Sequence, residues 1–89
     1  MRLSKTQREV LRLMAEDWEL GRSTGLSTRC WLQKNGIGRV GKTKDVRFTT
    51  LFALEGRGLI FGKYKYPTMK YFLTESGKFY AEQTVKQEQ

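Results

Sequence analysis

The glycine-rich segment 36–42 carries the basic residues Arg39 and Lys42, a combination suited to phosphate binding. Glycine lets a backbone turn freely and approach a phosphate closely, and the two cations would neutralise its charge. A nucleotide-hydrolysing phosphate loop is not expected, because no strand is predicted before the segment. We expect a connector between two helices that adds charge to a binding surface.

A second basic stretch interleaves lysines with aromatic residues. It contains Lys63, Lys65 and Lys70 together with Tyr64 and Tyr66. Lysines neutralise phosphates, while tyrosines can stack on bases or donate hydrogen bonds to the backbone of a nucleic acid. The alternative is an exposed hairpin stiffened by tyrosine pairs, with lysines that protect its edge from aggregation.

No combination of residues typical of catalysis or metal binding is present. The sequence has no His and a single cysteine, Cys30, so the usual general base at neutral pH, a zinc ligand set and an internal disulfide are lacking. We therefore expect a protein that is not an enzyme and that binds no metal or cofactor. The lone cysteine and the lack of an apolar run of about 18 residues predict a cytoplasmic protein without a membrane span.

Positive charge is concentrated in the middle of the chain. The formal net charge is +8, and the whole basic excess lies between Leu20 and Leu73, where only Asp45 and Glu55 oppose it. A segregated basic excess attracts a polyanion, most commonly a nucleic acid. The alternative is a surface whose charge serves solubility.

The first third of the chain predicts two helices that would position these groups. Ser4 and Gln7 fit a capping box, and apolar residues at helical spacing predict a helix over 5–19 that ends at Gly21. Ser27 would cap a short second helix over 27–35.

Trp31 lies in the predicted second helix. In that setting we expect it to be a core residue. The alternative is a platform on which a base stacks.

A third helix is predicted over 43–57. Thr43 would cap its start, and Asp45 would lie in the first turn, where the helix dipole favours an anion. Gly58 would end the helix in the left-handed C′ position.

The last third predicts a hairpin and a final helix. Residues 59–61 and 71–73 would form the two strands, and Thr74 would cap the helix. We expect one domain over residues 1–89, with 84–89 frayed.

The order helix, helix, helix, hairpin and helix resembles the winged helix-turn-helix superfamily, especially small regulators of the MarR and PadR kind. Residues 50–60 look like the end of their recognition helix, 73–78 like the junction after their wing, and 3–13 like their opening helix. The resemblance implies an α+β fold with three helices, a two-stranded wing hairpin and a C-terminal helix. It also implies a transcriptional regulator of double-stranded DNA, commonly a homodimer on a palindromic site.

The resemblance further implies that the third helix enters the major groove and that the hairpin lies along phosphates. Arg47 would read a base, because a guanidinium can bridge both acceptors of guanine; its alternative role is to pack across the helix and pair with Asp45 or a phosphate. The expected DNA-binding residues are Arg39, Lys42, Thr43, Lys44, Arg47, Thr49, Lys63, Lys65 and Lys70.

Phe48 and Phe52 conflict with this arrangement. A helical wheel places both rings on the side where DNA should lie. They either cover the second helix or form a patch for a protein partner. The alternative function is therefore a protein-interaction module, an adaptor or inhibitor, and a third option is RNA binding by the same basic face. The protein interface would comprise Phe48, Phe52, Tyr64 and Tyr66.

Overall fold

The computed structural model describes residues 2–24, 29–37, 41–65 and 68–88. In this part of the chain the fold is α+β, with three helices and one antiparallel sheet of five strands. The helices are α1 (Lys5–Ala15), α2 (Phe48–Gly56) and α3 (Glu75–Glu88). The strands are β1 (Trp18–Ser23), β2 (Cys30–Lys34), β3 (Thr43–Asp45), β4 (Ile60–Lys65) and β5 (Thr68–Leu73).

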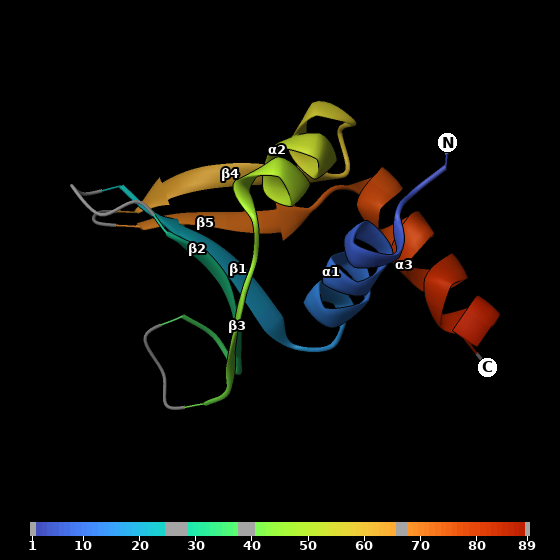
Figure 1. Cartoon of the computed structure of the whole chain (residues 1–89), viewed down its shortest axis with the longest axis horizontal. Helices are drawn as coiled ribbons and strands as arrows, with labels where there is room; N and C mark the ends of the chain where they lie inside the picture. The colour runs from blue at the N-terminus through green and yellow to red at the C-terminus, as the bar shows by residue number, and fades with distance from the viewer. Residues whose placement is uncertain (1, 25–28, 38–40, 66–67, 89) are drawn as a thin grey trace.

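The sheet has the strand order β3-β2-β1-β5-β4. Figure 1 shows α1 and α3 packed together beside the sheet, with α2 above the hairpin of β4 and β5. The opposite face of the sheet carries no helix in the described ranges, and we call it the open face.

The core lies between the sheet and α1. Leu20 of β1 pairs in register with Leu32 of β2 and with Tyr71 of β5, and all three side chains are buried. Leu11 of α1 and Leu51 of α2 are buried in the same cluster. Removing each such side chain from water stabilises the fold by about 1.5–3 kcal/mol, so these contacts fix which face of the sheet the helices cover.

The predicted winged helix-turn-helix fold is wrong, because the segment expected to form its second helix is strand β2. Buried and half-exposed side chains alternate there: Cys30 and Leu32 are buried, whereas Trp31 and Gln33 are not. A period of two is the pattern of a strand with one buried face. Ser27, the expected cap of that helix, lies outside the described residues.

The first helix is also shorter than predicted. It ends at Ala15, and Trp18 begins β1, in the middle of which Gly21 lies instead of closing a helix. Asp17 has a φ of 69°, which turns the chain from the helix into the strand. Trp18 follows Met14 and Ala15 at helical spacing, which was compatible with one more helical turn, and pairing of the segment with β2 and β5 decides in favour of a strand.

The predicted third helix loses its first turn to the sheet. Residues 43–45 form β3, and the amide of Val46 donates to the carbonyl of Cys30. The helix begins at Phe48 with Arg47 at the N-cap, where no side chain accepts a hydrogen bond. One predicted helix is missing and two others are shortened, and the hairpin of β4 and β5 belongs to a five-stranded sheet and is not a two-stranded wing.

Several local predictions are confirmed. Ser4 and Gln7 form both hydrogen bonds of the capping box, and Thr74 accepts from the amide of Gly77 at the start of α3. Gly58 has a φ of 73°, and the amide of Leu59 donates to the carbonyl of Leu54, as in a Schellman ending. The hairpin is present and longer than predicted.

No helix in the described ranges is long and apolar enough to cross a membrane. The expected fraying at 84–89 falls on residues whose side chains are outside the described part of the chain.

Candidate nucleic-acid interface

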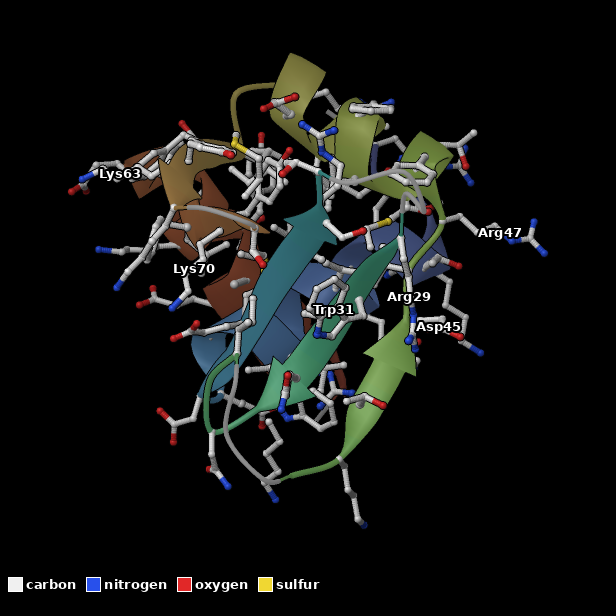
Figure 2. The ribbon with its side chains drawn as sticks, turned by 90° about the vertical axis from the view of Figure 1, so that its left-hand side faces the viewer. Arg29, Trp31, Asp45, Arg47, Lys63 and Lys70 are labelled. Carbon is white, nitrogen blue, oxygen red and sulfur yellow. The ribbon has the colours of Figure 1, made fainter. Side chains whose placement is uncertain are left out.

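One residue from each strand contributes to a row across the open face. The row consists of Asp45, Trp31, Gly21, Lys70 and Lys63, in strand order from β3 to β4. Figure 2 shows Trp31 near the centre of this face, with Arg29 and Asp45 on one side and Lys70 and Lys63 on the other. Strands lie about 4.8 Å apart, so the row is about 19 Å long.

The β4–β5 side of the row is cationic. Lys63 and Lys70 are direct partners across the two strands, and like charges directly opposite each other are destabilising. Lys70 has a counter-charge nearby, since its Nζ lies 3.7 Å from Oε2 of Glu19. Lys65 extends the same side of the face opposite Thr68. A bound anion would relieve the repulsion between the lysines.

The β2–β3 side holds an aromatic ring beside a second cation. Nε and Nη2 of Arg29 donate to Oδ1 of Asp45 over 3.1 and 2.7 Å, and the guanidinium carbon lies 5.9 Å from the centre of the Trp31 ring. The indole Nε1 donates to Oε1 of Gln33 over 3.3 Å. Because 60% of the Arg29 side chain is exposed, it can face a phosphate while it stays paired with Asp45.

Between these two sides, Ile37 covers the strand at Gly21. A Cβ atom at Gly21 would collide with Cδ1 of Ile37, so glycine is needed there for the close approach. The amide of Ile37 donates to Oε2 of Glu19 over 3.3 Å. Glu19 therefore ties the segment after β2 to the open face and also lies near Lys70.

The possibility of a phosphate loop requires a correction. The expectation that no strand precedes the segment is wrong, because β2 ends at Lys34, and the residues Gly36, Gly41, Lys42 and Thr43 have the spacing of such a loop. However, Thr43 begins strand β3 and not a helix. The helix N-terminus that binds phosphate in these loops is therefore not present at Lys42.

The structure distributes the expected DNA-binding residues over three places. Lys63, Lys65 and Lys70 gather on the open face. Arg47 and Thr49 are exposed at the start of α2 and line, with Lys44, a groove of about 580 Å³ beside the start of α1. Lys42 and Thr43 are exposed next to and within β3. Arg39 lies outside the described residues.

Lys44 is directed away from the open face. Its ammonium group pairs with the carboxylate of Glu9 on α1. That hydrogen bond, with the positive charges of Lys44 and nearby Arg12, lowers the pKa of Glu9 below its usual value. The contact links β3 to α1 across the groove, which is a structural role that the sequence did not predict.

The residues expected to form a protein interface are also divided. Phe48 packs against the core, whereas Phe52 is 49% exposed, and the two rings are stacked with centres 5.8 Å apart. Tyr64 is 60% exposed on β4. Tyr66 is outside the described part of the chain.

Sequence reasoning did not select several residues of the open face. They are Glu19, Arg29, Phe61 and Phe72, and Trp31 was expected in the core. The signal that could have found Trp31 is the alternation over 30–33, which places it opposite the buried Cys30 and Leu32. In the described residues no group of three His, Cys, Asp or Glu side chains could hold a metal ion.

A scan against models of known protein families finds no match to this chain, and a search of curated proteins finds no similar sequence.

Proposed function

We propose that the protein binds nucleic acid through the open face of its sheet. The observation that carries the proposal is the pair of facing lysines, Lys63 and Lys70, on the same helix-free face as Trp31. This face suits a ligand that has both phosphates and bases. Phosphates would neutralise the two lysines that repel each other, and a base could stack on the accessible Trp31 ring beside the Arg29 guanidinium.

The phosphate backbone would cross the sheet from the lysines of β4 and β5 toward Arg29. The net charge of +8 adds a long-range attraction for a polyanion. Arg47 stands at the edge of this face near β3 (Figure 2) and extends the basic surface beyond Arg29. In this proposal the protein acts by occupying a site on the nucleic acid and performs no catalysis.

The proposed ligands include double-stranded DNA, and a role in transcription is compatible with this proposal. The proposal does not include docking by a recognition helix and a wing, because the fold of the described residues has neither.

We also propose that the protein works in the cytoplasm. The buried thiol of Cys30, which donates to the carbonyl of Val46, suits a reducing compartment.

The test is a fluorescence titration of labelled duplex and single-stranded DNA over a salt series. Three to five phosphate contacts predict a slope of about −2 to −4 in log affinity against log salt. Lys65→Gln should weaken binding, whereas Lys5→Gln, a matched loss of charge on the helix side, should not. If neither nucleic acid binds at low salt, the proposal fails.

A second candidate function is self-association through α2. The exposed ring of Phe52 stacked on Phe48 favours it, since exposed apolar groups often mark interfaces. Light scattering should then report a dimer that Phe52→Asp converts to a monomer. If light scattering reports a monomer for the original protein as well as for Phe52→Asp, this candidate function is excluded.

A further inference from the structure

Strands β1 and β5 separate at one end of the sheet. Their pairing ends at Leu20 and Tyr71. Each strand continues on its other side, β1 to Trp18 with β2 and β5 to Leu73 with β4. The gap is a cleft of about 850 Å³, which we call the β1–β5 cleft.

Aromatic side chains line both walls of the β1–β5 cleft. Trp18 lies on the β1 side, on the face that the helices cover, and Phe61 and Phe72 lie on the other side, on the open face. The two phenylalanines are direct partners across β4 and β5, with ring centres 5.6 Å apart, and are 41% and 40% exposed. Flat, accessible rings of this kind form a surface on which a nucleic-acid base can stack.

Cations stand at the rim of the cleft. Lys63 lies two residues from Phe61 on the same face of β4, about 7 Å along the strand, and Lys78 approaches from α3. On the β1 wall, Glu19 lines the cleft, and its carboxylate accepts from the amide of Ile37 and lies near Lys70. Phosphate-binding and base-binding groups are thus within reach of one nucleotide.

We infer that the β1–β5 cleft holds an unpaired base, so that the nucleic acid is single-stranded where it crosses the sheet. This inference rests on the proposed function. In a duplex, neighbouring bases cover both faces of each base, and none is free to stack on Phe61 or Phe72 without leaving the helix. The lining balances Lys63 and Lys78 against Asp17 and Glu19. A nucleic acid is favoured over an apolar protein segment because Lys65 and Lys70 extend the positive charge beyond Lys63 on the same face, and because the net charge is +8.

The experiment compares three fluorescein-labelled ligands at equal salt: a short mixed-sequence single strand, its duplex, and an abasic strand of the same length. The single strand should bind about tenfold more tightly than the other two. Phe61→Leu and Phe72→Leu, which keep the apolar volume and lose the ring, should reduce single-strand affinity about tenfold. Phe79→Leu on α3, an exposed ring that does not line the cleft, is the matched control and should change nothing.

Trp18 supplies a readout that needs no change in the cleft. In a Trp31→Phe protein it is the sole tryptophan, and its fluorescence should be quenched by the normal strand and not by the abasic one. Equal binding of all three ligands, with unchanged Trp18 fluorescence, would overturn the cleft assignment and leave the proposed function intact. Absence of binding to every ligand would overturn both.

Discussion

Lys63 and Lys70 face each other across β4 and β5 on the open face of the sheet. Their ammonium groups repel when no ligand is present, and phosphate would reverse that repulsion. Binding and stability should therefore respond in opposite directions when one lysine is removed.

Lys63→Gln should weaken nucleic-acid binding about fivefold, equivalent to about 1 kcal/mol. The free energy of unfolding should stay equal or rise by a few tenths of a kcal/mol, because a like-charge pair is relieved. Anisotropy titration and urea unfolding measure the two effects, with Lys5→Gln as the control. A variant that binds normally but unfolds more easily would assign Lys63 to stability.

Glu19→Gln should strengthen nucleic-acid binding by about threefold. The glutamine keeps an oxygen that can accept from the amide of Ile37, and it removes the negative charge beside Lys70. Titration at low salt should show the gain, and the gain should shrink as salt screens the charges. Weaker binding would mean that Glu19 itself contacts the ligand.

Acid should weaken the contact between Lys44 and Glu9. The pKa of Glu9 is lowered in the folded protein, chiefly by its hydrogen bond from Lys44. The pair therefore stabilises the fold above the ordinary Glu9 pKa of 4.5, and this contribution is lost as pH falls through the lower folded value. Urea unfolding at a series of pH values should show a loss of at most about 1 kcal/mol, as for a surface pair.

Lys44→Gln tests the assignment of that acid response. The variant should be slightly less stable at neutral pH and should lose part of the dependence on pH. If Lys44→Gln and the original protein lose stability equally on acidification, the response belongs to other carboxylates.

Cys30 should react slowly with iodoacetamide. Burial raises the pKa of its thiol, and its side chain is buried in the core, so little reactive thiolate is present or accessible at neutral pH. Mass spectrometry should show alkylation at least about tenfold slower than in guanidinium-unfolded protein. Equal rates would indicate that β2 opens readily.

Local signals in the sequence predicted the parts of the fold that short-range hydrogen bonds determine. The Ser4 capping box, the helix ending at Gly58 and the cap at Thr74 each depend on residues within one turn. The hairpin followed from a run of strand-forming residues on each side of a turn.

The sheet could not be predicted in the same way, because it depends on distant pairing. Leu20 pairs with Tyr71 across fifty-one positions of sequence (71 minus 20), and no local pattern encodes such a partner. Without that pairing, Trp31 had the pattern of a residue in a short helix. The open face is a product of the same pairing, so the lysines were predicted as ligand contacts while Arg29, Phe61 and Phe72 were not.

Amide chemical-shift mapping tests the open face most directly. Single-stranded DNA added to ¹⁵N-labelled protein should shift the amides of Gly21, Trp31, Lys63 and Lys70, and should leave those of α1, and of α3 away from Lys78, nearly unchanged. Shifts confined to the helices, with the open-face amides unmoved at saturating ligand, would contradict binding through this face.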